Sequence, residues 1–211
     1  MLEGVAKTAL GTLMSRAKDG DVFAQRTAQF LQTKGQLHGF EGFYFPPAVE
    51  RSTIIDVCVR AILKKRGYRK ILNLGCGFCG RYHRIAEEFE LDEWCDVDSA
   101  GTIALRREYD PPNEVHTYLV HDLQTDLAIL SNYDLIIAEG CLMYLPIATA
   151  KKIVAASPHI VFDVLGRYRT MPRGSDQKWL FDERAWELNI VTMLGFGYAD
   201  RDDRILEVIN T

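Results

Sequence analysis

Residues 72–84 read LNLGCGFCGRYHR, and the segments on either side of this loop predict the fold. Its glycines form the pattern GxGxxG, and its cysteines form CxxC within the same loop. Glycines between a strand and a helix let the backbone approach a ligand closely and adopt positive φ. CxxC is instead typical of zinc sites or of redox chemistry. The residues concerned are Gly75, Cys76, Gly77, Cys79 and Gly80.

Short segments that are apolar along most of their length follow one another from residue 70 onward, separated by helix-like segments. Strands of this kind are buried on both faces, which is typical of a parallel sheet between two layers of helices. Each crossover is expected to be right-handed. The predicted strands are Lys70–Leu74, Glu93–Val97, His116–Val120, Asp134–Ala138 and Ile160–Val164. The predicted helices are Arg81–Phe89, Ser99–Arg107 and Ala148–Ala156.

The C-terminal part of the chain has a different pattern. Asp182–Leu194 is predicted to be a helix that begins at a capping aspartate. Gly197–Asp200 and Arg204–Ile209 flank a charged turn and are predicted to form a hairpin. The expected fold is α/β, with one Rossmann-like domain, a mostly parallel seven-stranded sheet, a C-terminal antiparallel hairpin and an N-terminal helical cap.

The first 66 residues are predicted to be mainly helical. Apolar residues recur at helical spacing up to about residue 34 and again over Arg51–Lys65, where Gly67 ends the pattern. Ligands of open α/β sheets bind at the carboxyl ends of the strands, and we expect these helices to cover that edge. Residues 1–66 are therefore predicted to form a cap or lid, and residues 67–211 the Rossmann-like domain.

The composition argues against several classes of protein. Hydrophobic residues make up 47% of the 211 residues and charged residues 26%, and the formal net charge of −4 gives no basic surface for nucleic acid. The N-terminus lacks a signal-peptide pattern, and no apolar run is long enough to cross a bilayer. Five cysteines in a chain of this length indicate reduced thiols. We expect a cytoplasmic protein with a small-molecule substrate and without a membrane or nucleic-acid partner.

Acidic residues after the glycine loop indicate a cofactor that contains adenosine. Asp98 ends the next strand, where a carboxylate can accept hydrogen bonds from both ribose hydroxyls. Asp122 follows the third strand, where it can accept from the adenine amino group while the Leu123 amide donates to a ring nitrogen. Glu139 ends the fourth strand and faces the same edge.

Two cofactors fit this arrangement, a nicotinamide dinucleotide and S-adenosylmethionine. The dinucleotide fingerprint usually opens its domain, whereas roughly seventy residues precede the loop here. The predicted antiparallel hairpin also fits the sheet of methyltransferases better. S-adenosylmethionine is therefore favoured, and a nicotinamide-dependent oxidoreductase stays open as an alternative.

Four strings resemble one branch of the class I S-adenosylmethionine-dependent methyltransferases, the leucine carboxyl methyltransferases and their polyketide O-methyltransferase relatives. NLGCGFCGRYHRI, residues 73–85, resembles the family's NLGAGxDTRxxRL. AEGCLMYLP, residues 138–146, is similar to its AEGxLxYLP, the most distinctive string. WCDVDSAGTIALRR, residues 94–107, resembles its second strand and the helix after it. PPAVERSTIID, residues 46–56, carries Arg51 where the family has an arginine that faces the cofactor.

The resemblance implies a role for each residue of the site. Arg51 would hold the methionyl carboxylate, Glu139 would receive the ammonium group, and Tyr144 would face the methyl-transfer pocket as the catalytic residue. The other implied cofactor-binding residues are Gly75, Cys76, Gly77, Asp98, Asp122, Leu123 and Gly140. No metal is implied. The chain departs from the family at Cys79-Gly80, where the family usually has Asp-Thr, and it has no room for the long insertion that shapes the acceptor pocket of the leucine carboxyl members.

The expected reaction is O-methylation of a carboxylate on a small metabolite or biosynthetic intermediate. Such an acceptor is ionised near neutral pH, so positioning is the main requirement and no general base is needed. A phenol or hydroxyl acceptor would need a base. The histidines considered for that role are His38, His83, His116 and His121. The first three are more simply explained as structural or surface residues, and His121, beside the expected adenine site, is better placed for binding than for chemistry.

Other features have simpler explanations. The basic pair Arg106-Arg107 is predicted to lie on a solvated helix face. The CxxC has no second pair of ligands for a zinc site, so thiol chemistry is a minor alternative. A methyltransferase fold that binds without catalysing is a further alternative, and a nucleic-acid methyltransferase is disfavoured by the acidic balance.

Overall fold

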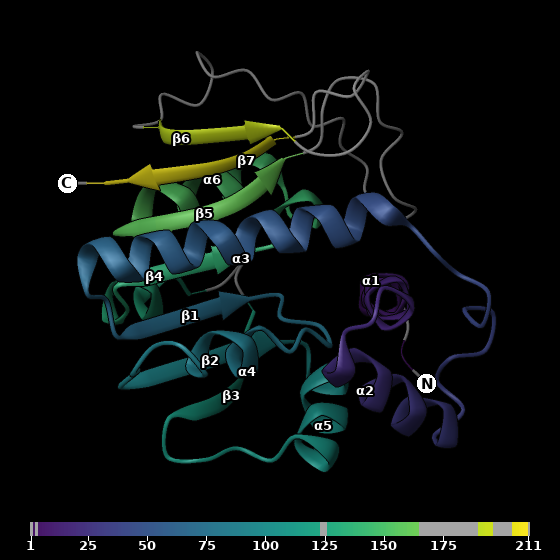
Figure 1. The fold of residues 1–211 in the computed structure, drawn as a ribbon. Coiled ribbons are helices and arrows are strands. Elements are labelled where there is room, and N and C mark those ends of the chain that lie inside the picture. Colours follow the sequence, from purple (N-terminus) through teal and green to yellow (C-terminus); the bar gives the residue numbers. More distant parts are fainter. Residues whose placement is uncertain (1, 3, 123–125, 165–189, 196–203, 211) are drawn as a thin grey trace.

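A seven-stranded sheet forms the centre of the computed structural model, which describes residues 2, 4–122, 126–164, 190–195 and 204–210 (Figure 1). The strand order is β3-β2-β1-β4-β5-β7-β6. Strands β1 to β5 are parallel to one another, and β7 is antiparallel to both β5 and β6. The strands are β1 Lys70–Leu74, β2 Glu93–Asp98, β3 His116–Val120, β4 Leu135–Ala138, β5 His159–Val164, β6 Ile190–Gly195 and β7 Arg204–Ile209. The predicted α/β, broadly Rossmann-like fold with a mostly parallel sheet is confirmed, but the antiparallel pair at the C-terminus is β6 with β7 rather than the predicted hairpin.

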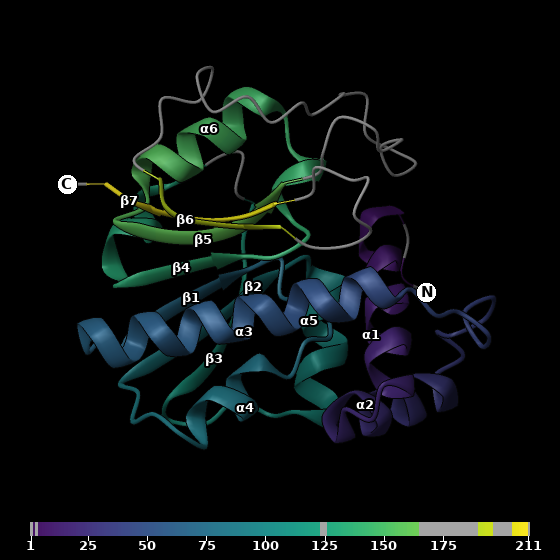
Figure 2. The same cartoon turned by 45° about the horizontal axis from the view of Figure 1, so that its top comes forward.

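Helices cover both faces of the sheet and its carboxyl edge. The helices are η1 Gly4–Lys7, α1 Thr8–Lys18, α2 Val22–Thr33, α3 Pro46–Arg66, α4 Arg81–Ala86, α5 Ala100–Tyr109, η2 Ala128–Asn132, η3 Leu142–Tyr144 and α6 Ile147–Ala156. Figure 2 shows α6 on one face and α3 with α4 on the other. Among the described residues, no helix combines the length and the apolar character needed to span a membrane.

Alternate side chains of β1 enter different apolar clusters. Leu72 and Leu74 belong to the cluster under α6, whereas Ile71 belongs to the cluster under α3. Successive side chains of a strand point to opposite faces, so β1 is buried on both faces of the sheet. β1 and β3 have the predicted bounds.

The first two helices lie beside the carboxyl ends of the parallel strands, against the glycine loop (Figure 1). Glycines provide the room for this packing. A Cβ at Gly77 would lie 3.0 Å from the Cβ of Ala9 in α1, and a Cβ at Gly80 would lie 2.6 Å from Cγ of Phe23 in α2. By contrast, α3 packs on the face of the sheet. Whether residues 1–66 act as a separate cap stays a prediction.

The predicted C-terminal helix needs correction. Residues 190–194 were expected at the end of a helix, but they form β6, which pairs with β7 from Ile190↔Val208 to Gly195↔Arg204. Ile190, Val191 and Thr192 are β-branched and favour a strand once a partner edge is available. The hairpin partner predicted for β7, Gly197–Asp200, lies outside the described residues, as do residues 182–189 of the predicted helix.

The helix predicted over Arg51–Lys65 begins earlier, at Pro46, and Gly67 ends it in the left-handed conformation with φ +67°. Proline suits the first turn of a helix, where its missing N–H is not needed. Arg51 therefore lies in the second turn of α3 rather than at its first residue, and its side chain lines the cavity at the carboxyl edge of the sheet.

Gly80→Ala tests the packing of α2 on the loop. The added methyl group would meet the ring base of Phe23, which cannot move aside without moving α2, so we expect the free energy of unfolding to fall by about 1–3 kcal/mol. Gly42→Ala is the matched control, since a Cβ there has nothing within 4 Å. Denaturant unfolding measures both variants, and equal stability of the two would refute the proposed contact.

Candidate functional site

A cavity of about 940 Å³ lies at the carboxyl ends of the strands, between the glycine loop and the N-terminal helices. Nearly all of the predicted site residues line it. These are Arg51, Gly75, Cys76, Gly77, Asp98, Asp122, Glu139, Gly140 and Tyr144. The structure thus brings together residues from five separate segments of the chain. Leu123 lies outside the described residues, so the adenine contact expected of its amide stays a prediction.

The glycine loop has the conformation that the sequence pattern predicts. Gly75 has φ +62° and Gly77 has φ +50°, which L-residues rarely adopt. A Cβ at Gly75 would also lie 2.7 Å from the Cβ of Cys141, in the loop after β4. Gly75 is therefore required both by its backbone conformation and by its close neighbour.

Asp98 closes the loop from the end of β2. Its Oδ2 accepts a hydrogen bond from the Gly77 amide at 2.8 Å, and its Oδ1 accepts from the Ser99 amide at 2.7 Å. Each carboxylate oxygen has a second lone pair, so Asp98 can still accept from two further donors. A diol such as a ribose offers two hydroxyl donors that match this fixed carboxylate.

A group of ion pairs forms the wall of the cavity at the ends of β4 and β5. Arg51 Nε lies 3.1 Å from Glu139 Oε1, and Arg51 Nη1 lies 3.4 Å from Asp163 Oδ2. The other oxygen of Glu139 pairs with Arg81. Burial alone would raise the pKa of the Glu139 carboxyl, but Arg81 and Arg51 hold this pKa below its ordinary value. Glu139 is thus an ionised acceptor at neutral pH.

Gly140 allows Arg51 to reach these carboxylates. Its φ is +60°, and a Cβ at this position would lie 3.0 Å from Arg51 Nη2. The Gly140 amide donates to Asp163 Oδ1 at 2.5 Å. Burial raises the pKa of the Asp163 carboxyl, although Arg51 opposes the shift. Since Arg51 is only loosely shared between two carboxylates, an anionic ligand group could compete for it.

The ion pairs continue away from the cavity wall toward α2. Arg81 Nε lies 2.6 Å from Asp56 Oδ1, and Arg84 Nε lies 2.7 Å from Asp56 Oδ2. Arg84 also pairs with Asp21, the N-cap of α2, at 3.1 Å, and Asp21 accepts from Arg16 Nε at 2.9 Å. Charged residues therefore connect α1 and α2 to the edge of the sheet.

Tyr144 lies where the N-terminal helices close the cavity. It lines the cavity from η3, and its hydroxyl donates to Thr8 Oγ1 of α1 at 3.2 Å. Of the histidines considered as bases, the described part of the chain places only His121 on the cavity wall, and its Nε2 hydrogen-bonds the Asp126 carbonyl at 2.7 Å. A phenol hydroxyl is thus better placed than an imidazole to contact an acceptor.

The sequence analysis missed a buried polar cluster beneath the glycine loop. Arg106 was expected on a solvated helix face, but its side chain is fully buried. Its Nη1 donates to the carbonyls of Gly77 and Cys79 at 3.2 and 2.8 Å, and its Nη2 donates to Asp96 at 2.9 Å. Asp96 also accepts from Asn73 and Trp94. Asn73 in β1 and Asp96 in β2 were the signal for this cluster in the sequence. They are polar residues within predicted buried strands, and they pair side by side in the sheet.

The cysteines of the loop do not have the environment of a redox pair. Burial raises the pKa of the Cys76 thiol well above its ordinary value. Reactive thiols need the opposite shift, since the thiolate is the nucleophile. Cys76 is a small buried residue of the loop, which agrees with the simpler interpretation of the CxxC.

No protein-family model matches the chain, and no curated protein sequence matches it. Several solved methyltransferases share this fold. The methyltransferase domain of bacterial CtHen1 is 12% identical, with a TM-score of 0.57, and the match covers 75% of this chain and 99% of that one. Magnesium protoporphyrin IX methyltransferase from Synechocystis, bound to SAH, is 13% identical, with a TM-score of 0.57 and coverage of 86% and 94%.

The N-methyltransferase NodS from Bradyrhizobium japonicum is 19% identical, with a TM-score of 0.55, and the match covers 76% of this chain and 96% of that one. At such identities the likeness establishes the Rossmann-like methyltransferase fold. The more specific resemblance to the leucine carboxyl methyltransferases is not among these findings.

Asp56→Asn tests the ion pairs behind the cavity. Burial alone would raise the pKa of Asp56, but Arg81 and Arg84 lower it from 3.8 to about 2. A lowered pKa means that the carboxylate stabilises the fold above about pH 4 and that this contribution is lost as the pH falls toward 2. We expect Asp56→Asn to reduce the free energy of unfolding at pH 7 by at least about 2 kcal/mol.

The difference between wild type and Asp56→Asn should shrink below pH 4, as measured by urea unfolding at pH 7, 5 and 3. Asp19→Asn is the control, because Asp19 is exposed. A difference that is independent of pH would show that the charge of Asp56 is not what stabilises the fold.

Proposed function

We propose that the protein is an S-adenosylmethionine-dependent methyltransferase that methylates a carboxylate of a small metabolite. The observation that carries the proposal is the carboxyl-edge cavity, where a positive-φ glycine loop meets a carboxylate fixed at the end of β2. The cofactor would supply a methyl group on a sulfonium, and neither Gly75 nor Gly77 of the cavity lining has a Cβ that would narrow the space for it. Asp98 would accept from the ribose hydroxyls, and Arg51 would bind the methionyl carboxylate.

The charges of the wall support this orientation. Both oxygens of Glu139 pair with guanidinium groups, those of Arg51 and Arg81. The carboxylate of a bound amino-acid group would replace Glu139 as a partner of Arg51, and its ammonium group would replace Arg51 as a partner of Glu139. Exchange within a balanced network avoids the cost of leaving one buried charge unpaired. Arg51 and Glu139 thus suit a zwitterionic amino-acid group.

The size of the cavity supports a small acceptor. Ligand pockets of about 300–1,000 Å³ accommodate cofactors and drug-sized molecules, and this cavity is near the upper end of that range. The part near α1 has an apolar wall that includes Leu13, Phe43 and Phe45. Arg16 lines the same part, and its Nη1 is buried without a hydrogen-bond partner in the described residues. An acceptor carrying a carboxylate on an apolar body would suit these neighbours.

The chemistry requires alignment rather than proton transfer. An acceptor carboxylate oxygen forms a bond to the methyl carbon as the carbon–sulfur bond breaks, and an ionised carboxylate has no proton to lose. Tyr144 would donate a hydrogen bond to the acceptor, releasing Thr8 to do so. The chain's contribution would be to hold the two reactants in line and to exclude water.

Calorimetric titration of the purified protein with S-adenosylmethionine tests the cofactor assignment. Asp98→Asn removes the charge while keeping the shape of the side chain, and we expect it to weaken binding by at least about tenfold, because hydrogen bonds to a charged group contribute about 1.5–3 kcal/mol. Asp19→Asn, an exposed substitution, should bind like wild type. Absence of binding to wild type, or binding of NAD(H) instead, would refute the assignment.

Turnover separates an enzyme from a binding module. Methyl transfer from labelled S-adenosylmethionine to a panel of small carboxylic acids and matched phenols should yield esters from the acids, with Tyr144→Phe lowering kcat. Tight cofactor binding without any product across the panel would favour the non-catalytic alternative. Methylation of the phenols alone would refute the carboxylate acceptor but keep the cofactor assignment.

A further inference from the structure

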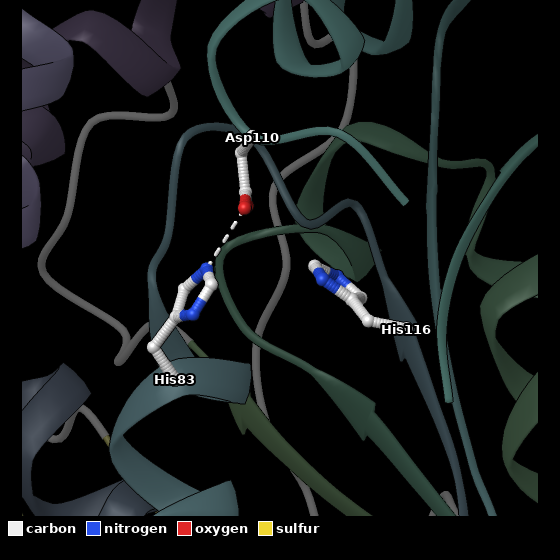
Figure 3. A group of neighbouring side chains, drawn as sticks. All are labelled: His83, Asp110 and His116. Carbon is white, nitrogen blue, oxygen red and sulfur yellow. Dashed lines mark hydrogen bonds and ion pairs between the residues drawn. The ribbon is translucent and has the colours of Figure 1, made fainter. Parts of the chain in front are cut away.

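His83, Asp110 and His116 form a compact cluster outside the cavity, on the face covered by α4 and α5. They come from α4, the C-terminal end of α5 and the start of β3. One potential ligand atom from each residue lies within 4.8 Å of the other two. Figure 3 shows the three side chains pointing from different elements toward the space between them.

The ring of His116 has one nitrogen available for a further partner. Its side chain is fully buried, and its Nε2 lies 3.0 Å from Asp96 Oδ2, so a neutral imidazole that donates to this carboxylate has its lone pair on Nδ1. This Nδ1 is buried and has no hydrogen-bond partner among the described residues. A buried imidazole whose outer nitrogen is held by a carboxylate is the arrangement found around metal-binding histidines. An unpaired buried acceptor is costly, so a partner for Nδ1 is physically favoured.

Asp110 has one oxygen left for a cation. Its Oδ2 accepts from the Tyr118 hydroxyl at 2.7 Å and from Arg106 Nη2 at 3.2 Å. Its Oδ1 faces His83, with Nε2 at 3.0 Å. The second lone pair of Oδ1 remains for a further partner.

His83 connects the cluster to solvent. Its side chain is 38% exposed, whereas those of Asp110 and His116 are 9% and 0% exposed. Tyr82 stacks on the ring of His116 with the centroids 4.1 Å apart. A small ion can enter past His83, and a water molecule can complete its coordination there.

The charge balance favours a cation. Two carboxylates, those of Asp96 and Asp110, face one guanidinium, that of Arg106, and the histidines are neutral when they act as ligands. The remaining single negative charge suits a divalent ion. Imidazole nitrogens with one carboxylate are ligands of borderline metals such as Zn²⁺ rather than of Mg²⁺ or Ca²⁺.

We propose that His83, Asp110 and His116 bind a Zn²⁺ ion, with water as the fourth ligand and Asp96 as the partner that orients His116. The ion would join the ends of α4, α5 and β3. Arg106 contacts both Asp110 and the carbonyls of Gly77 and Cys79, so the site would also stiffen the glycine loop from below. Its role is structural, in contrast to the expectation from sequence that the chain holds no metal.

Titration of chelator-treated protein with Zn²⁺ tests this site independently of any activity. We expect 1:1 binding and a higher Tm of the wild-type protein on addition of Zn²⁺. His83→Gln should weaken Zn²⁺ binding at least about tenfold and abolish the rise in Tm. His83 is part-exposed, so this variant is expected to fold, and circular dichroism verifies it. His38→Gln is the matched control, because His38 is 95% exposed and outside the cluster.

Co²⁺ in place of Zn²⁺ identifies the ligands. Visible d–d bands that are present in wild type and lost in His83→Gln and Asp110→Asn would support the proposed site. A strong sulfur-to-cobalt charge-transfer band would assign the ion to the cysteines and overturn the proposal. Absence of binding to wild type, or equal binding by wild type and His83→Gln, would overturn it as well.

Discussion

The buried guanidinium of Arg81 determines how the parts of the site can be assembled. It is 1% exposed, and it pairs at the same time with Asp56 of α3 and Glu139 after β4. A charge in this position costs several kcal/mol unless all of its partners are present and aligned. The helix before the sheet, the helix after the glycine loop and the end of β4 must therefore meet in one arrangement. Arg81 also positions Arg51 indirectly, because both guanidinium groups pair with the same carboxylate, that of Glu139.

The elements of the fold were predictable because their signals are local. β1 and β3 have the predicted bounds, and β1 lies between a charged residue, Arg69, and a glycine, Gly75. The glycine loop was predictable for a similar reason. Gly75 and Gly77 both have positive φ, which glycine adopts more readily than other residues, and they directly follow a predicted strand. The clustering of the site residues followed from topology, because parallel strands end at the same edge.

The missed features depend on partners that the order of residues does not reveal. Arg106 resembles any basic residue of a surface helix, and only the fold places Asp96 and the loop carbonyls around it. The sequence of β6 does not by itself distinguish a strand from the end of a helix. Its pairing with β7 makes it a strand. The need for a glycine at Gly80 is a further case, because the ring of Phe23 that packs against it lies more than fifty positions earlier in the chain.

The contact of α1 and α2 with the glycine loop has a thermodynamic consequence. Ala9 and Phe23 rest on Gly77 and Gly80, the residues whose backbone shapes the cavity floor. Docking of the helices and ordering of the loop are therefore coupled: each event makes the free energy of the other more favourable by the same amount. A ligand that orders the loop would therefore also favour the docked position of the two helices.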